Sequence, residues 1–137
     1  MSLEKIINDA WENRDQVNQN SDKSIKDAIN QVIEDLDSGK SRVAEKINDK
    51  WVTHQHLKKA IMLSFRIYGM ETLAGPYSSW HDKAHLLKGK TSGWTKKEFE
   101  EAGFRMVPNS PVRKGSFIAK NVVLMPCFVN IGAYIDE

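Results

Sequence analysis

The chain has 137 residues, of which 40% are hydrophobic and 28% are charged, and its formal net charge at pH 7 is only +2. This length suits one domain, or one domain and the start of another, and the hydrophobic content suffices for a buried core. The balanced charge argues against a nucleic-acid surface, and no apolar stretch approaches the roughly 20 residues that a membrane span needs.

Two amphipathic helices are predicted at the N-terminal end. Apolar residues recur at intervals of three and four in residues 3–11 and again in residues 25–36, which is the spacing of one helix face. Ser2 is a suitable cap for the first helix. The polar residues 18–21 separate the two helices, and Ser38-Gly39 is a suitable stop for the second.

A β-hairpin is predicted next. Residues 42–47 and 50–52 are short β-prone runs, separated only by Asn48-Asp49. Both linking residues tolerate positive φ, as a tight hairpin turn requires. Thr53 then has the side chain of a helix cap.

A third helix is predicted from about residue 54 to residue 68. Its main face is apolar, and Met62, Leu63 and Ile67 make the other side apolar as well. Because a helix that is apolar nearly all round is usually buried, we expect this helix at the centre of the N-terminal domain.

Residues 75–93 are rich in glycine, proline and serine, which predicts irregular structure. Thr95 and Glu98 then match a capping box, so a short helix is expected to begin there and to end near Gly103. Residues 104–107 are predicted to form a strand.

The last part of the chain carries apolar residues at a spacing of six, namely Pro111, Phe117, Val123, Val129 and Ile135. Neither a helix nor an ordinary strand has this period. It is typical of a parallel β-helix, in which each short strand points one residue inward and three hexads complete a coil. We therefore expect an N-terminal domain in residues 1–107 and the start of a β-helix in residues 108–137.

This predicted β-helix is short. Residues 111–137 make one and a half coils, whereas such stacks need several units and caps for stability. We expect Val123, Val129 and Ile135 to face water in an unfinished stack, and we expect the chain to be an N-terminal fragment of a longer protein.

Several side chains that are often functional favour ordinary structural roles here. Four histidines, His54, His56, His81 and His85, invite a metal site, and the last two have the spacing of one helix face. Zinc usually needs three or four ligands, and no cysteine pair helps, so no metal site is predicted.

Three further candidates also favour structural roles. The single cysteine, Cys127, is interpreted as a small packed residue, and its isolation favours a reducing cytoplasm. Residues 89–93 lack the glycine spacing of a phosphate-binding loop. Trp51, Trp80 and Trp94 can stack on a ligand, but burial in a core is the commoner fate.

Arg105 is the strongest candidate for a binding residue. It lies on the predicted strand between the apolar Phe104 and Met106, just before the hexads. An arginine in this setting can clamp a carboxylate with two parallel hydrogen bonds, although a surface salt bridge explains it as well. Arg66 and Arg113 are weaker candidates for the same role.

Several segments of the chain resemble the tetrahydrodipicolinate N-succinyltransferase family. They follow the same order as in that family and span both predicted regions, and they are residues 42–47, 51–55, 57–60, 63–66, 103–105, 107–108, 117–119, 123–126 and 129–134. No confident match covers residues 70–94.

The resemblance implies a small α+β domain, mainly helical with a β-hairpin, joined to a left-handed parallel β-helix, in homotrimers. It implies transfer of a succinyl group from the co-substrate succinyl-CoA to tetrahydrodipicolinate, on the way to diaminopimelate and lysine, with no permanently bound cofactor. Arg105 matches an arginine that binds the dicarboxylate substrate. The family's acidic residue that activates the acceptor amine and the coenzyme A groove lie beyond residue 137, so no catalytic or coenzyme A residue is assigned and the chain alone is expected to be inactive.

Two other functions stay open from the sequence. One is a different hexapeptide-repeat acyltransferase with another acceptor, and the other is a non-enzymatic assembly module. A nucleic-acid or membrane partner is not expected.

Overall fold

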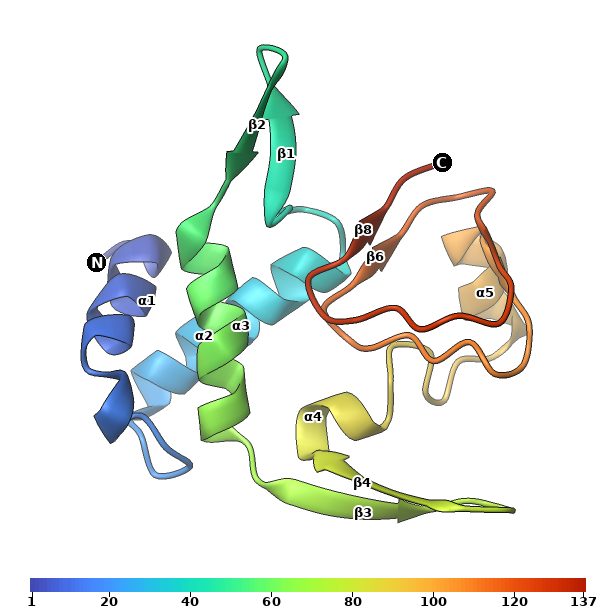
Figure 1. The fold of residues 1–137 in the computed structure, drawn as a ribbon, viewed down its shortest axis with the longest axis horizontal. Coiled ribbons are helices and arrows are strands. Elements are labelled where there is room, and N and C mark those ends of the chain that lie inside the picture. The colour runs from blue at the N-terminus through green and yellow to red at the C-terminus, as the bar shows by residue number, and fades with distance from the viewer.

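In a computed structural model of residues 1–137, three helices pack together at the N-terminal end and short strands wind round at the C-terminal end (Figure 1). The helices of this N-terminal bundle are α1 (Leu3–Glu12), α2 (Lys23–Asp37) and α3 (Gln55–Ile67), with a 3-10 turn, η1 (Arg14–Gln16), after α1. The whole is a mixed arrangement of helices and two-stranded sheets.

The two N-terminal helices confirm the predictions from their apolar spacing. The Ser2 hydroxyl caps α1 by accepting a hydrogen bond from the Lys5 N–H at 3.3 Å. α2 ends where predicted, and Gly39 follows with a φ of 78°. A side chain at Gly39 would meet the Phe117 ring within 3 Å, so this glycine lets the end of α2 approach the C-terminal strands.

The predicted hairpin is also present. β1 (Ala44–Ile47) and β2 (Lys50–Thr53) pair in antiparallel fashion, and Asn48 and Asp49 between them have φ values of 48° and 62°. The prediction that Thr53 caps α3 was wrong. Thr53 continues β2, and His54 occupies the cap position without a side-chain cap bond.

Helix α3 lies between α1 and the C-terminal strands in Figure 1 and packs against both α1 and α2. The prediction that it is buried all round was wrong at Met62, whose exposed fraction is 49%, while its neighbour Leu63 is fully buried. Ile61, on the same helix, lies against Gly132 in the turn before the last C-terminal strand.

A second hairpin extends into residues 75–93, so the prediction that this region is irregular was wrong for its second strand and the helical turn after it. β3 (Met70–Ala74) and β4 (Ser79–Lys83) pair in antiparallel fashion and lead into a single helical turn, α4 (Ala84–Leu87). All five residues of β3 are exposed, so the strand has no buried face to produce an alternating pattern. Backbone pairing, closed by a 2.8 Å bond from the Gly75 N–H to the Ser78 carbonyl, holds the hairpin.

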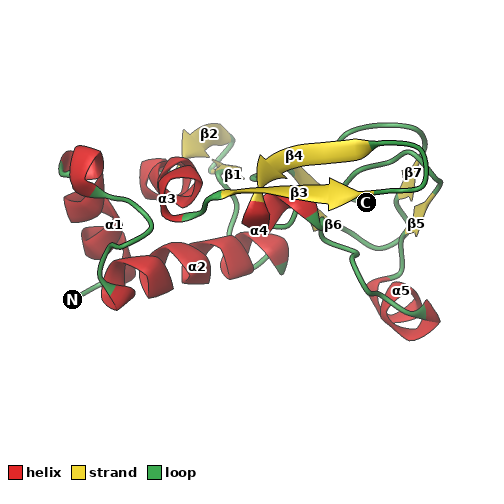
Figure 2. Ribbon diagram, turned by 90° about the horizontal axis from the view of Figure 1, so that it is seen from below, coloured by secondary structure: helices red, strands yellow, loops and turns green.

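The capping box is confirmed. In α5 (Lys96–Ala102), the Thr95 N–H donates to the Glu98 carboxylate at 2.7 Å, and Gly103 ends the helix with a φ of 75°. Phe99 and Trp94 pack edge-on, with ring centroids 5.2 Å apart, and both lie against Phe104. Figure 2 shows α5 beside the C-terminal strands, at the opposite end of the molecule from the bundle.

The C-terminal strands pair in parallel. They are β5 (Arg105–Met106), β6 (Phe117–Ile118), β7 (Val123–Leu124) and β8 (Tyr134–Ile135). Arg105 lies opposite Val123, and Phe117 lies opposite Tyr134, so partners stand 18 and 17 positions apart in sequence. Residues 104–137 therefore form a coil in which each short segment, or side, lies beside the side one turn earlier. We call residues 104–137 the winding.

The inward positions of the winding differ from the predicted ones. Val112, Ile118 and Leu124 are buried at the predicted spacing of six, but each lies one residue after the predicted Pro111, Phe117 and Val123.

From Val129 onward the predicted phase is correct. Val129 lies five positions after Leu124 and not six, so this shorter segment restores the predicted phase. Val129 was expected to face water, yet it is buried and bridges to Val112.

The bundle and the winding are held together by Asp37, the last residue of α2. The Lys90 ammonium lies 3.0 Å from its carboxylate and donates to its backbone carbonyl at 2.7 Å, and the Gly115 N–H donates to the same carboxylate at 2.8 Å. Ile33, Leu86 and Ile131 form a small apolar cluster nearby. The predicted boundary between residues 107 and 108 stays a prediction. None of the helices has the length and hydrophobicity needed to cross a bilayer.

Candidate functional site

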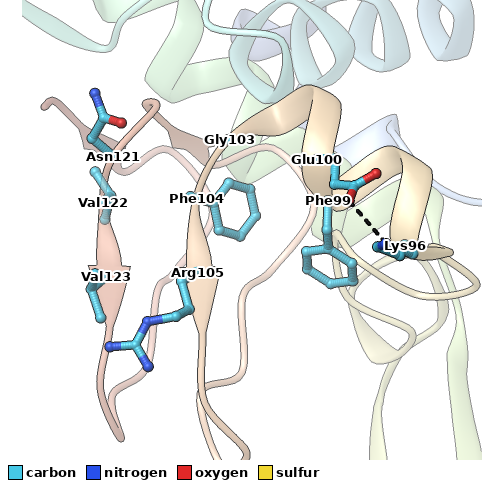
Figure 3. A pocket seen from close by; sticks show the side chains of 9 residues that line it. All are labelled: Lys96, Phe99, Glu100, Gly103, Phe104, Arg105, Asn121, Val122 and Val123. Atoms are coloured by element: carbon cyan, nitrogen blue, oxygen red, sulfur yellow. Dashed lines mark ion pairs between the residues drawn. The ribbon is translucent and has the colours of Figure 1, made fainter.

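Arg105 lies in an open groove of about 410 Å³ between α5 and the parallel pair of β5 and β7 (Figure 3). Its lining combines aromatic, aliphatic and charged side chains, namely Lys96, Phe99, Glu100, Gly103, Phe104, Arg105, Asn121, Val122 and Val123. In Figure 3 the Arg105 guanidinium extends away from the helix, beside Val123.

Backbone bonds fix the position of Arg105. Its N–H donates to the Val122 carbonyl at 2.9 Å, and the Asn121 N–H donates to the Gly103 carbonyl at 2.8 Å. Neighbouring residues of a strand point to opposite sides, so Phe104 enters the core while Arg105 is exposed. The left-handed Gly103 allows the sharp change from α5 into this strand.

The guanidinium of Arg105 has no protein partner. It takes part in none of the ion pairs or side-chain hydrogen bonds of the structure, whereas Lys96 and Glu100 in the same groove pair with each other at 3.3 Å. A surface salt bridge therefore does not account for Arg105. Its donors remain free for a carboxylate, which a guanidinium binds with two parallel hydrogen bonds.

The two weaker arginine candidates are occupied. Arg66 donates to the Arg14 carbonyl at 2.8 Å and lies 3.6 Å from Asp15. Arg113 pairs with Asp82 and donates to Asn130 at 3.3 Å. The structure thus separates Arg105 from the arginines that serve as internal links.

The histidines do not converge. His54 lies 2.6 Å from the Glu45 carboxylate, at the base of the first hairpin. His81 is on β4 and His85 is on α4, so the prediction that they share one helix face was wrong, because β4 extends to Lys83. No three histidine, cysteine or acidic side chains cluster in the way that a metal site requires.

His85 has the most altered chemistry of the four. It stacks on Tyr68 with ring centroids 4.2 Å apart, and its Nε2 lies 3.1 Å from the Ser64 hydroxyl. Since that hydroxyl already donates to the Ile61 carbonyl, Nε2–H is the donor and Nδ1 carries the lone pair. Burial lowers the pKa of His85 to about 4.

Three other sequence candidates take distinct positions. Cys127 is exposed, so the interpretation of this side chain as a small packed residue was wrong. Trp51 and Trp80 are exposed at 69% and 50%, so their predicted burial was also wrong, since both lie on hairpins with one or both faces open. Residues 89–93 form the predicted loop, in which Lys90 is engaged by Asp37.

Sequence reasoning missed the other wall of the Arg105 groove. Asn121 has a φ of 65°, which turns the chain ahead of β7 and brings it beside Gly103. Asn121 lies three residues past β6, and an asparagine is a signal for such a turn because it tolerates positive φ. A second groove, between β4, α4 and the winding, was missed because the fold of residues 70–94 was not predicted.

Comparison with known proteins gives a consistent result. Residues 2–67 match the family described as tetrahydrodipicolinate N-succinyltransferase N-terminal. A 2,3,4,5-tetrahydropyridine-2,6-dicarboxylate N-succinyltransferase of Pelagibacter ubique is 70% identical over 135 residues, which is 98% of this chain and 49% of that protein.

Proteins of the same name show lower identity. The one from Sodalis glossinidius is 50% identical over 137 residues, and the one from Parvibaculum lavamentivorans is 49% identical over 138 residues. These alignments cover 99% and 98% of this chain. The chain spans about half the length of the curated relatives it matches.

Proposed function

We propose that this protein takes part in 2,3,4,5-tetrahydropyridine-2,6-dicarboxylate N-succinyl transfer, because the chain is related by sequence to the N-terminal part of the tetrahydrodipicolinate N-succinyltransferases. Succinyl-CoA is the donor and the ring-opened substrate is the acceptor, on the route to diaminopimelate and lysine. The reaction is CoA-dependent acyl transfer to nitrogen, and no permanently bound cofactor is required.

The chemistry sets what the protein must supply. The amine lone pair attacks the thioester carbonyl, the C–N bond forms, and the C–S bond breaks as the thiol of coenzyme A leaves. A protonated amine has no lone pair, so a carboxylate must accept its proton. Hydrogen-bond donors must also stabilise the oxyanion of the tetrahedral intermediate. Direct attack needs no acyl-cysteine, so Cys127 has no role in this step.

Arg105 supports this proposal on the acceptor side. The acceptor is a dicarboxylate, and Arg105 presents a guanidinium without any protein partner in an open groove. We assign Arg105 to one acceptor carboxylate, where two parallel hydrogen bonds fix the substrate's orientation. The free guanidinium is the single observation that carries this assignment.

The remaining machinery is assigned outside these 137 residues. We propose that the winding begins a left-handed β-helix and that the active protein is a cytoplasmic homotrimer with clefts between neighbouring β-helices. The parallel pairing of β5 with β7 and of β6 with β8 supports the β-helix. The carboxylate that accepts the amine proton and the coenzyme A contacts then belong to later coils, and residues 1–137 alone turn over no substrate.

An extended protein tests the proposal. It consists of residues 1–137 followed by the part of the Pelagibacter ubique relative that has no counterpart in this chain. We expect succinyl transfer by the extended protein and none by residues 1–137. In the extended protein, Arg105→Gln should raise the KM for the acceptor, because loss of a charge-assisted hydrogen bond is worth about 1.5–3 kcal/mol, or roughly 10- to 150-fold.

Two controls make this test specific. Arg66→Gln removes a guanidinium that is already held by the Arg14 carbonyl and Asp15, so the KM should stay unchanged. Arg105→Lys keeps the charge but loses the paired donors, and it should give an intermediate KM. An extended protein without succinyl transfer, beside an active Pelagibacter enzyme, contradicts the function. An unchanged KM in Arg105→Gln contradicts the role of Arg105 alone.

A further inference from the structure

The hairpin of β1 and β2 exposes large apolar side chains. Trp51 is 69% exposed, Ile47 and Val52 are also exposed, and every residue of β2 is exposed. Partners in the register share a face, so Trp51 lies on the face of Lys46, while Ile47 and Val52 lie on the other. A two-stranded hairpin alone is only marginally stable in water, so these apolar faces indicate a contact surface.

The base of this hairpin already contacts the winding. The Arg42 guanidinium lies over the Tyr134 ring, 3.9 Å from its centroid, and 3.8 Å from the Asp136 carboxylate. On the adjoining helix, Ile61 packs against Gly132. The hairpin is therefore anchored to the last side of the winding.

The last strand of the winding has one unused edge. β8 pairs with β6 and with no other strand. An unpaired edge is a template for another strand. In Figure 1, β8 lies above β6. The hairpin also extends upward, past β8, toward its tip at residues 48–49.

We propose that this hairpin is a docking surface for further coils of parallel β-strands, stacked on β8 in the same polypeptide, which pack sideways against Trp51. The length of the relatives supports this occupant, because they are about twice as long as the chain. Continuity supports it as well, since the Arg42 contacts with Tyr134 and Asp136 begin the same interface. The inference rests on the proposed function in taking the β-helix of that family as the occupant.

Footprinting with hydroxyl radicals and mass spectrometry tests the contact. Residues 1–137 and the extended protein defined above are exposed to the same radical dose, with Met1, at 87% exposure, as the internal gauge. We expect oxidation of Trp51 to fall at least fivefold in the extended protein. A change of less than twofold overturns the proposal.

A second copy of the chain is the other possible occupant. Protection of Trp51 in residues 1–137 that increases with protein concentration would identify that occupant and also overturn the proposal. The readout does not depend on turnover. If Trp51 is protected in an extended protein that is inactive, the docking surface is supported and the proposed function is contradicted.

A pair of variants provides a second measurement. Trp51→Ser should lower the Tm of the extended protein and leave the Tm of residues 1–137 unchanged, because only the extended protein buries this side chain. Thr53→Ser, two residues on along β2 and on the same face, serves as the matched control. An equal Tm shift from Trp51→Ser in both proteins contradicts the docking surface even if the footprint is ambiguous.

Discussion

The helical bundle and the winding bury their side chains in different ways. α1, α2 and α3 satisfy their own backbone hydrogen bonds and enclose a core in which Ile7, Ile29 and Leu63 are fully buried. Each short side of the winding pairs with a side 17 or 18 positions away in sequence and buries few residues. The bundle therefore closes its own core, whereas the winding depends on the elements that pack around it.

Cavity formation should reveal this difference most strongly. Leu63→Ala removes a fully buried side chain at the centre of the bundle, and we expect a loss of about 4 kcal/mol in the free energy of unfolding. Urea unfolding followed by circular dichroism measures it. Met62→Ala, its exposed neighbour on the same helix, should change stability by less than about 0.5 kcal/mol.

The same truncation in the winding sharpens the comparison. Leu124 is buried in the smaller cluster, beside the exposed Val123. The few residues around Leu124 can move into the cavity that the substitution leaves. Leu124→Ala should therefore lower the free energy of unfolding by about 2 kcal/mol, at the low end for such substitutions. Equal losses from Leu63→Ala and Leu124→Ala would show that the two regions form one core.

Breaking the link between the regions should separate them. The side chains of Lys90 and Asp37 are 7% and 20% exposed, so Lys90→Met leaves a largely buried carboxylate without its cation. We expect a loss of about 3 kcal/mol. Hydrogen exchange should show faster exchange in β6 and β8 with little change in α1.

An exposed pair across the same boundary is the control. Lys114→Met removes a cation that pairs with Glu34 at the surface, and it should cost no more than about 1 kcal/mol. If both variants destabilise the protein equally, burial of the Lys90 pair is not what couples the bundle to the winding.

Stability at acidic pH should depend on His85, which joins α4 to the bundle. Its pKa is lowered to about 4 by burial, against the opposing charge of Asp82 and with Arg113 and Lys83 adding to the decrease. In the unfolded chain His85 is therefore protonated below about pH 6.5, whereas in the folded chain it is protonated only below about pH 4. Stability is retained above pH 6.5 and lost as the pH falls through this window.

The His85 effect should be modest, because the side chain is partly exposed. After allowance for solvent screening we expect about 1–2 kcal/mol between pH 7 and pH 4. His85→Gln should flatten the pH dependence of the urea midpoint in this range. His81→Gln, whose ring is exposed on β4, should leave the dependence as it is in the parent protein.

Most of the helices and the first hairpin could be predicted from sequence, because their patterns are local. The stripes of residues 3–11 and 25–36, the Asn48-Asp49 turn and the Thr95 capping box each express one short-range rule, and each is present. β3 could not be predicted, because an exposed strand of mixed composition produces no alternation. In the winding the period of six was correct, but its phase depended on the five-residue side between Leu124 and Val129, which only the pairing defines.

The sequence singled out a candidate residue, whose binding role stays a prediction, but it did not indicate the surroundings of that residue. Arg105 was singled out by its apolar neighbours, which follow from strand alternation. Its lack of an ion pair depends on the positions of every acidic side chain nearby, and no local pattern encodes those. The groove's other wall, at Asn121, is 16 positions away and approaches only through the pairing of β5 with β7.

The smallest expected effect separates a real helix cap from one that the sequence only suggested. Both Thr53 and Thr95 precede helices, but only Thr95 takes part in a capping box, and its helix α5 packs on the winding through Phe99. Thr95→Ala should therefore cost about 1 kcal/mol. Thr53→Ala should cost less than about 0.5 kcal/mol, since the residue lies exposed in β2. Because α5 packs on the winding and not on the bundle, the loss in Thr95→Ala should be accompanied by faster hydrogen exchange in β5 and β7. Unchanged exchange in these strands would show that α5 does not stabilise the winding.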